Sequence, residues 1–283
     1  MAQDKMQSSR FENKYIITEA TALGIREFVQ SFLVHDEYGA GKPNFSYPVH
    51  SIYLDSPQLK TYWDTINGDR NRFKLRVRFY NDDPAAPVFF EIKRRVNNCI
   101  QKQRAGVHRS AAASLAAGDL PFVEDLTANN PKHLVAAQNF ARLVQLIEAR
   151  PVVHVAYLRE AYLPTDGNSA RLTMDRLVCT EPVHALRLST HMTHPQLVWG
   201  HTVVLELKFT DRFPNWFGDL VRVFNLRQCG AAKYADGITL MNGERPAHRR
   251  QPGAMLDLGW PEDSLFSDAC DRQDAEMNTA SAK

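Results

Sequence analysis

One segment of this chain, Lys74-Leu75-Arg76-Val77-Arg78-Phe79, alternates strictly between cations and apolar residues. Successive side chains of a β-strand point to opposite faces of a sheet. The segment therefore predicts a strand with three cations on one face and three apolar side chains on the other. A sheet that contains such a strand must give its charged face either to water or to a charged interior.

The same alternation recurs along the chain. An acid and a base two residues apart share a strand face three times, in Glu12-Asn13-Lys14, Glu91-Ile92-Lys93 and Glu206-Leu207-Lys208. Further cations on expected strands are Lys102, Arg104, Arg159 and Arg171. A solvent-exposed face of an antiparallel sheet explains any one of these strands. Because at least five strands carry almost purely Arg, Lys and Glu, the alternative is a barrel with a charged interior and amphipathic helices outside.

Hydrophobic periodicity and turn residues predict about eight strands and four helices. We expect the strands at residues 10–17, 49–54, 72–80, 88–96, 99–107, 152–163, 170–179 and 202–209, with a weaker candidate at 184–189. We expect the helices after Thr18, from Pro57, over 131–149 and from Pro214. Short connections between consecutive strands indicate an α+β fold with a mostly antiparallel sheet, which a barrel would close.

Composition and charge distribution predict one folded domain. The chain has 283 residues and a net charge of +2, but residues 251–283 carry −5, so the remainder carries +7. We expect a domain over 10–245, a disordered N-terminus over 1–9 and an acidic, disordered tail over 246–283. Single, scattered cysteines and the lack of a long apolar run in the sequence favour a reducing, cytoplasmic location.

A cationic interior with a few carboxylates suits a specific chemistry. Arg and Lys neutralise phosphate oxygens, and carboxylate oxygens are the ligands that Mg²⁺ and Mn²⁺ prefer. The charged strand faces therefore indicate a site for a polyphosphate group and a divalent metal. They disfavour a nucleic-acid interface, because no aromatic side chains are interleaved with the cations.

Six short segments, in register along the chain, resemble the VTC domain, the catalytic domain of the eukaryotic polyphosphate polymerase of the vacuolar transporter chaperone complex. They are Arg10–Tyr15, Ser51–Ser56, Leu75–Tyr80, Phe90–Lys93, Val204–Lys208 and Ala232–Tyr234. The resemblance covers about Arg10 to Met241. VTC domains belong to the CYTH-like triphosphate tunnel metalloenzymes, so the resemblance implies an eight-stranded antiparallel β-barrel that forms a tunnel, flanked by helices.

The resemblance also implies an activity and its residues. VTC domains transfer the γ-phosphate of ATP to a growing polyphosphate chain with Mn²⁺ or Mg²⁺. Catalytic contacts to the triphosphate and the product would come from Lys14, Arg76, Arg78, Lys93, Arg159 and Arg171. Further substrate contacts would come from Lys74, Lys102, Arg104, Lys208 and Lys233, the last at one tunnel mouth. Glu206 would be the main metal ligand, with Glu12 and Glu91 beside it.

Two departures from the family pattern keep alternatives open. Family members often have a lysine where this chain has Gly230, which weakens the case for handling a long chain. We also expect no phosphate-sensing domain and no membrane helices of the kind found in the eukaryotic subunits, so moving polyphosphate across a membrane would need a partner. A metal-dependent triphosphatase of the same fold and a non-catalytic polyphosphate-binding module are the alternatives. Asp175 lies four residues after Arg171 on the same strand face, so it either orients this arginine or forms a simple surface salt bridge with it.

Overall fold

The computed structural model describes residues 11–97, 99–165, 170–210 and 212–243. The expected disordered N-terminus (1–9) and acidic tail (246–283) lie outside the described residues. Within the described chain, no helix is long and apolar enough to cross a membrane.

The described chain forms two compact units. Unit 1 contains His50–Val155 and Pro182–Thr190, and unit 2 contains Phe11–Val49, Ala156–Glu181 and the described part of His191–Lys283. Each unit has its own buried apolar cluster. The prediction of a single domain over 10–245 stays a prediction.

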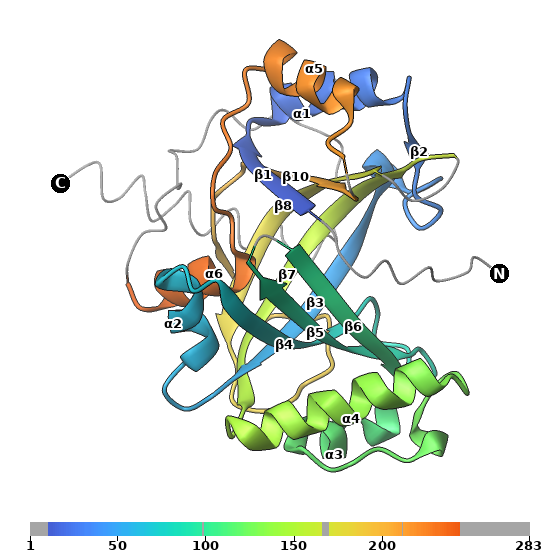
Figure 1. Cartoon of the computed structure of the whole chain (residues 1–283), viewed down its shortest axis with the longest axis vertical. Helices are drawn as coiled ribbons and strands as arrows, with labels where there is room; N and C mark the ends of the chain where they lie inside the picture. The colour runs from blue at the N-terminus through green and yellow to red at the C-terminus, as the bar shows by residue number, and fades with distance from the viewer. Residues whose placement is uncertain (1–10, 98, 166–169, 211, 244–283) are drawn as a thin grey trace. The chain divides into compact units, whose positions relative to one another are not determined.

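The predicted α+β class with an antiparallel sheet is confirmed (Figure 1). The strands are β1 (Phe11–Ile17), β2 (Val34–His35), β3 (Ser46–Asp55), β4 (Asn71–Phe79), β5 (Val88–Val96), β6 (Cys99–Val107), β7 (Arg150–Leu163), β8 (Ala170–Pro182), β9 (Gln196–Leu197) and β10 (Val203–Phe209). The α-helices are α1 (Glu19–Val29), α2 (Lys60–Ile66), α3 (Ala112–Ala117), α4 (Pro131–Leu146), α5 (Asn215–Val223) and α6 (Lys233–Met241).

Hydrogen bonding orders the main strands β1-β10-β8-β7-β3-β4-β5-β6, and among the described residues this path does not close into the predicted barrel. The physical reason is visible at both ends of the path. The outer edge of β1 bridges to Gln228, and Cys229 N donates to Lys14 O at 2.9 Å. The outer edge of β6 bridges to Leu126 instead of to another strand. At these positions, the backbone N–H and C=O groups on the outer edges of β1 and β6 pair with loop residues and not with another strand.

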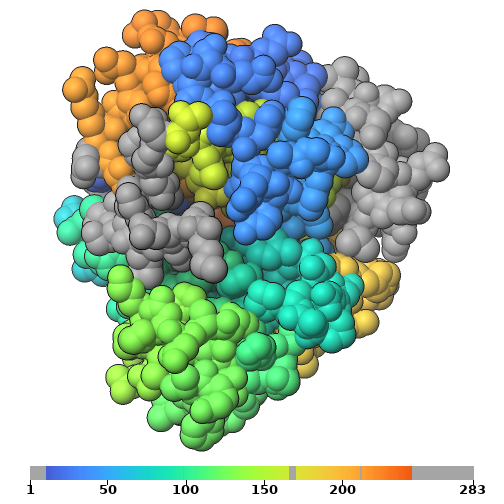
Figure 2. Space-filling view, turned by 90° about the vertical axis from the view of Figure 1, so that its right-hand side faces the viewer, coloured from blue at the N-terminus to red at the C-terminus, as the bar shows by residue number. Residues whose placement is uncertain are grey.

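In unit 1, β4, β5 and β6 form an antiparallel meander whose apolar face is covered by α3 and α4 (Figure 1). Leu75, Val77, Phe90 and Ile92 come from alternate positions of the strands and are at most 1% exposed. Phe140 of α4 packs edge-on against Phe90, with 4.9 Å between ring centroids. Figure 2 shows the segment of α3 and α4, in green, as an exposed surface. The helices thus cover one face of the meander, and the other face carries the charges.

In unit 2, β10 lies between β1 and β8. Helix α1 begins as predicted, because Thr18 Oγ1 accepts from Thr21 N at 3.2 Å. A buried ion-pair network also fixes α1: Arg26 Nε is 2.8 Å from Glu160 Oε1, and Arg176 Nη1 is 2.7 Å from Glu160 Oε2. Glu160 is fully buried. Glu160 follows Arg159 on β7, and neighbouring residues of a strand point to opposite faces. The ion-pair network of Glu160 therefore lies on the other face of β7 from Arg159.

Several predicted boundaries are wrong. The helix expected from Pro57 begins at Lys60, because the buried carboxylate of Asp55 accepts from Thr61 N at 2.9 Å and from Tyr62 N at 3.0 Å and so caps the helix there. Residues 184–189 form no strand. The sequence interpretation also missed helix α6, which begins at Lys233.

Candidate functional site

The charged face of unit 1 is organised in cross-strand rows. The register aligns Tyr53, Arg76, Glu91 and Arg104 across β3, β4, β5 and β6. Side chains directly opposite one another on a face have Cβ atoms about 5 Å apart. The row therefore places the carboxylate of Glu91 between two guanidinium groups. The alternation along each strand puts these residues on one face, but it does not determine which residues lie opposite one another.

Glu91 is the centre of this cluster and is fully buried. Arg76 Nε donates to Glu91 Oε2 at 2.6 Å, and Lys102 Nζ lies 2.6 Å from Glu91 Oε1. Arg104 Nε and Arg78 Nη1 lie at 3.5 and 3.9 Å from the same carboxylate. One negative charge thus faces four positive ones, and the cluster has an excess of positive charge.

This imbalance shifts the pKa values in unit 1. Burial alone would raise the pKa of Glu91, but Arg76, Lys102, Arg78 and Arg104 hold that pKa well below its usual value. Partial desolvation within the cluster and the neighbouring arginines lower the pKa of Lys102 to about 7, against the attraction of Glu91. Since 42% of the Lys102 side chain is exposed, this lysine can exchange protons with solvent near neutral pH.

Lys74 and Lys93 lie on the same face one row further along β4 and β5. The register aligns Lys74, Lys93 and Lys102 as directly opposite residues. Three cations in one row repel one another, and Glu91, 2.6 Å from Lys102, offsets part of this repulsion. Unit 1 therefore presents an anion-attracting face.

The charged face of unit 2 has a similar row pattern with more carboxylates. One row aligns Lys14, Glu206 and Thr173 across β1, β10 and β8, and the next aligns Glu12, Lys208 and Arg171. Acids and bases alternate along β10 and between β1 and β10, which is the arrangement in which opposite charges stabilise a sheet, whereas Lys208 lies opposite a second cation, Arg171, on β8.

Glu206 is the centre of the unit 2 cluster and is 5% exposed. Its Oε2 lies 2.6 Å from Lys208 Nζ, and its Oε1 lies 2.9 Å from Lys233 Nζ and 3.5 Å from Lys14 Nζ. Lys14 Nζ also lies 3.3 Å from Glu12 Oε1. Three lysines from β1, β10 and α6 therefore converge on one buried carboxylate.

Asp175 is a second buried carboxylate in this cluster. Arg159 binds it with both ends of its guanidinium, since Nε and Nη2 each lie 2.7 Å from an Asp175 oxygen. Lys233 Nζ lies 2.7 Å from Asp175 Oδ2 and so bridges Asp175 and Glu206. The ring of Tyr157 lies 5.1 Å from the Arg159 Cζ and 5.0 Å from Lys233 Nζ. The aromatic face adds a cation–π contact to each cation.

The pKa values in unit 2 follow from this packing. Burial alone would raise the pKa of Glu206, but Lys208, Lys233, Lys14 and Arg159 hold it well below its usual value. Burial lowers the pKa of Lys233, yet Asp175 and Glu206 more than compensate, so its net pKa is raised. Burial lowers the pKa of Lys208 to about 8, helped by Arg159 and Arg171 and opposed by Glu206.

The sequence model of one family, the VTC domain, matches residues 9–242. This chain belongs to the VTC domain family. The comparison with curated proteins finds no match. The resemblance described above is therefore confirmed for the family.

Three solved structures are distantly similar to this VTC domain. A proposed adenylate cyclase from Bacillus halodurans has a TM-score of 0.44 at 11% identity, covering 80% of this chain and 94% of that one. A protein from Pyrococcus horikoshii has a TM-score of 0.40 at 11% identity, covering 82% and 99%. The mimivirus capping enzyme triphosphatase has a TM-score of 0.34 at 12% identity, covering 77% and 89%. At these scores the likenesses do not bear on activity.

The structure places the predicted site residues of the VTC domain in two groups. Unit 1 brings together Arg76, Arg78, Glu91, Lys102 and Arg104, with Lys74 and Lys93 on the same face. Unit 2 brings together Glu12, Lys14, Arg159, Glu206, Lys208 and Lys233. Lys233, expected at a tunnel mouth, is 8% exposed and lies between two carboxylates of unit 2.

Arg171 is oriented by a different carboxylate from the one predicted. Its Nη2 lies 3.0 Å from Asp36 Oδ2, whereas Asp175 is bound by Arg159 and Lys233. The expectation that Asp175 orients Arg171 is wrong. Residues four apart on one strand are about 13 Å apart, while a cross-strand neighbour is about 5 Å away.

Sequence reasoning did not assign Asp36, Tyr157 or Thr173 to the site. Thr173 Oγ1 accepts from Lys208 Nζ at 3.1 Å. Thr173 and Asp175 follow Arg171 at two-residue intervals on β8, and Tyr157 precedes Arg159 in the same way on β7. The alternation that identified the arginines therefore also contained the signal for Tyr157, Thr173 and Asp175. Asp36 lies outside the alternating strands and gave no such signal.

The carboxylates of unit 2 have the chemistry of a divalent-metal site. Mg²⁺ is commonly held by one or two carboxylates together with substrate phosphates. Glu206 and Asp175 supply two buried carboxylates that share Lys233, and Glu12 lies beside Lys14. In the part of the chain that the structure describes, no group of three or more His, Cys, Asp or Glu side chains is arranged to hold a metal. The donor set fits a metal that phosphate oxygens help to bind.

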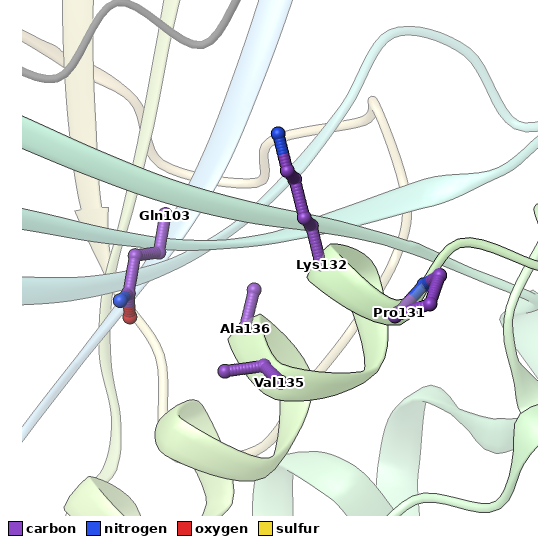
Figure 3. Close-up of a pocket in the computed structure, with 5 residues that line it drawn as sticks. All are labelled: Gln103, Pro131, Lys132, Val135 and Ala136. Carbon is purple, nitrogen blue, oxygen red and sulfur yellow. The ribbon is translucent and has the colours of Figure 1, made fainter.

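A pocket of about 240 Å³ lies on the helix-covered side of unit 1, where Gln103 of β6 meets Pro131, Lys132, Val135 and Ala136 of α4 (Figure 3). Gln103 lies between Lys102 and Arg104 in the sequence and therefore points to the opposite face of β6. The pocket is accordingly separate from the charged face of unit 1 and is not part of the candidate site.

Proposed function

We propose that this VTC domain is a polyphosphate polymerase that transfers the γ-phosphate of ATP to a growing polyphosphate chain. The observation that supports it most is the arrangement in unit 2, where buried carboxylates lie among Lys14, Arg159, Lys208 and Lys233. A pure anion-binding surface gains little from buried carboxylates, because they repel its ligand. A phosphoryl transferase uses them to bind a metal and to position cations.

In the proposed reaction, a terminal phosphate oxygen of the chain attacks the γ-phosphorus of ATP. The bond between that phosphorus and the β–γ bridging oxygen breaks, and ADP leaves with the electron pair. Lys14, Arg159 and Lys208 bind and orient the phosphate oxygens and stabilise the charge that they carry. Positioning and charge stabilisation account for most of the catalysis in phosphoryl transfer, so the chain needs no covalent intermediate.

Mn²⁺ or Mg²⁺, bound by Glu206 with Asp175 and Glu12, would supply charge neutralisation at the phosphates. The ammonium group of Lys233 lies within 3 Å of both Glu206 and Asp175 and so stabilises their ionised forms. Taken by itself, unit 1 carries a second set of cations that we propose to bind phosphate groups: Arg76, Arg78, Lys93, Lys102, Arg104 and Lys74.

The test is incubation of the full chain with ATP and Mn²⁺, followed by phosphorus NMR and a polyphosphate-staining gel. The proposal expects ADP together with a ladder of long chains. Free phosphate with ADP and no chains would replace the polymerase with a triphosphatase. Binding of polyphosphate without turnover of ATP in Mn²⁺ or Mg²⁺ would indicate a non-catalytic polyphosphate-binding module.

Gly230 favours the triphosphatase as the second candidate. Family members often have a lysine at this position, and here no atom lies within 4 Å of the place that a Cβ would occupy. The space that a lysine could fill is therefore open, and the charge that would help to retain a long product is absent at this position. The product analysis above decides between the two.

Lys102 provides a prediction that depends on pH. Because its pKa is lowered to about 7, much of it is neutral at pH 7.5, and a bound phosphate raises this pKa by attraction. Triphosphate binding at pH 7.5 is expected to take up part of a proton, and binding is expected to weaken as the pH rises from 7 to 9. Calorimetry in buffers of different ionisation enthalpy measures the uptake.

The matched variant for this measurement is Lys102→Arg. Arginine keeps its charge over this pH range, so the variant is expected to bind triphosphate without proton uptake and with a flatter pH profile. If the wild type and Lys102→Arg take up the same number of protons on triphosphate binding, the protonated group is not Lys102.

A further inference from the structure

The loop that follows β2 brings a buried carboxylate to the charged face of unit 2. Asp36 is 4% exposed, and its Oδ2 lies 3.0 Å from Arg171 Nη2. Arg171 belongs to the row that also contains Glu12 and Lys208. The loop, residues 36–45, lies outside the strands that carry the other charges of this cluster, so its contribution depends on how the loop itself is folded.

Hydrogen bonds within the loop fix the position of this carboxylate. Asp36 N donates to Ala161 O of β7 at 2.8 Å, and Asp36 O accepts from Gly39 N at 3.0 Å. Asp36 Oδ1 accepts from Tyr38 N at 2.9 Å, which is the hydrogen bond of an Asx turn. The backbone N–H, the backbone oxygen and Oδ1 of Asp36 therefore hold the loop, and Oδ2 binds Arg171.

Stacked rings join the two ends of the loop. His35 precedes the loop and Phe45 ends it, and their ring centroids are 3.9 Å apart. The ring of Tyr162 on β7 lies 4.5 Å from the ring of His35. A carboxylate on a loop that is closed and packed in this way loses little conformational freedom when it binds its partner.

Arg171 has a hydrogen-bond donor that this carboxylate does not use. Arg171 and Lys208 lie directly opposite each other, and each has its own carboxylate, since Lys208 Nζ lies 2.6 Å from Glu206 Oε2. Arg171 Nε is buried and has no hydrogen-bond acceptor among the described residues. A buried donor without an acceptor is unfavourable, and a phosphate oxygen is an acceptor that guanidinium groups bind well. Because 29% of the Arg171 side chain is exposed, a ligand can reach it.

We propose that Asp36 is a positioning residue, which orients the Arg171 guanidinium so that a phosphate group of the substrate becomes its second acceptor. This inference rests on the proposed function, because it takes a phosphate as the ligand. Asp36 acts through Arg171 and does not touch the substrate. Its negative charge repels a phosphate, so its benefit to binding comes from the orientation of Arg171 alone.

The test is a double-mutant cycle on the binding of inorganic triphosphate to the full chain, measured by calorimetry without metal or ATP. Asp36→Glu keeps the charge and moves the carboxylate by one methylene group. It is expected to weaken binding about fivefold when Arg171 is present and less than about twofold in the Arg171→Gln background. Arg171→Gln alone is expected to weaken binding about tenfold, because a charge-assisted contact is lost.

Glu37→Asp is the matched control, because it changes the next residue of the loop, an exposed acid, by one methylene group at constant charge. It is expected to bind triphosphate as the wild type does. A purely structural role of Asp36 would lower the melting temperature and weaken binding equally with and without Arg171. That result, or wild-type affinity in a folded Asp36→Glu protein, would overturn the proposal.

Asp36→Asn provides a second cycle if Asp36→Glu does not fold. Loss of the negative charge acts alike in both backgrounds, whereas loss of orientation acts only where Arg171 is present. The effect of Asp36→Asn on affinity is therefore expected to differ about fivefold between the two backgrounds, and equal effects would refute the positioning role. Because the assay measures binding alone, failure of the wild type to make chains from ATP would contradict the polymerase and not the cycle.

Discussion

Glu206→Gln is expected to lower the kcat of ATP turnover by about 100-fold or more, because the variant removes the charge on which three lysines of unit 2 converge. Without this carboxylate, the unit 2 site loses its main metal ligand and Lys208 loses its partner at 2.6 Å. The lysines then repel one another, so substrate phosphates bind in altered positions. Steady-state ADP release in Mn²⁺ measures the effect.

The same substitution tests stability. Removal of one partner of a buried ion pair costs about 3–5 kcal/mol, since the remaining charges stay buried without compensation. Glu206→Asp separates the two effects, because it keeps the charge and shortens the side chain by one methylene group. It is expected to retain most of the stability and still to lose activity. Glu27→Gln, an exposed change on α1, is the control for the loss of one negative charge. Wild-type kcat in a folded Glu206→Gln protein would refute the assignment of Glu206.

The faces of the strands could be predicted from the sequence because alternation is a local property. Arg76 and Glu91 were each assigned to the charged face of their own strands, and both lie there. Which cation meets which carboxylate depends on the cross-strand register, and this follows from turns and packing as well as from the pattern. The pairing of Arg159 with Asp175 is a result of that kind.

Lys233 shows a different limit. Helix α6 brings this lysine to Glu206 and Asp175, and nothing local in its sequence indicates that contact. The helix can approach β8 because Gly237 lies against Thr180, where a Cβ would come within 2.8 Å of the threonine hydroxyl oxygen. The resemblance to the VTC domain selected Lys233, but its position between two carboxylates depends on tertiary packing that the residue pattern does not contain.

The open sheet has a similar cause. The charged faces predicted a closed barrel, since closure would enclose them, but closure depends on the edges of β1 and β6. Both edges form backbone bridges to loop residues, Gln228 and Leu126. Hydrogen bonds of loops to strand edges leave no periodic signal in a sequence, so the open edges of the sheet could not be inferred from the alternation.

Glu91→Gln is expected to destabilise unit 1 by about 3–5 kcal/mol, because four cations lose the carboxylate between them. The pKa of Glu91 lies well below its usual value, so its contribution to stability is fully present above about pH 4.5 and is lost as the pH falls through the folded-state pKa. The stability difference between wild type and variant is thus expected to shrink as the pH falls into the acid range. Urea denaturation at several pH values measures it.

Inorganic triphosphate is expected to rescue Glu91→Gln. An anion that binds among Arg76, Arg78, Lys102 and Arg104 replaces the missing negative charge, and ligand at about 100 times its Kd contributes about 2.7 kcal/mol. Glu160→Gln is the matched control, because it removes an equally buried carboxylate from the ion pairs with Arg26 and Arg176. Triphosphate is expected to raise the melting temperature of Glu91→Gln by more than it raises the melting temperature of the wild type. For Glu160→Gln, the rise is expected to be no larger than for the wild type. Equal rises in all three would show that the unit 1 cluster is a structural ion-pair network and not a phosphate site.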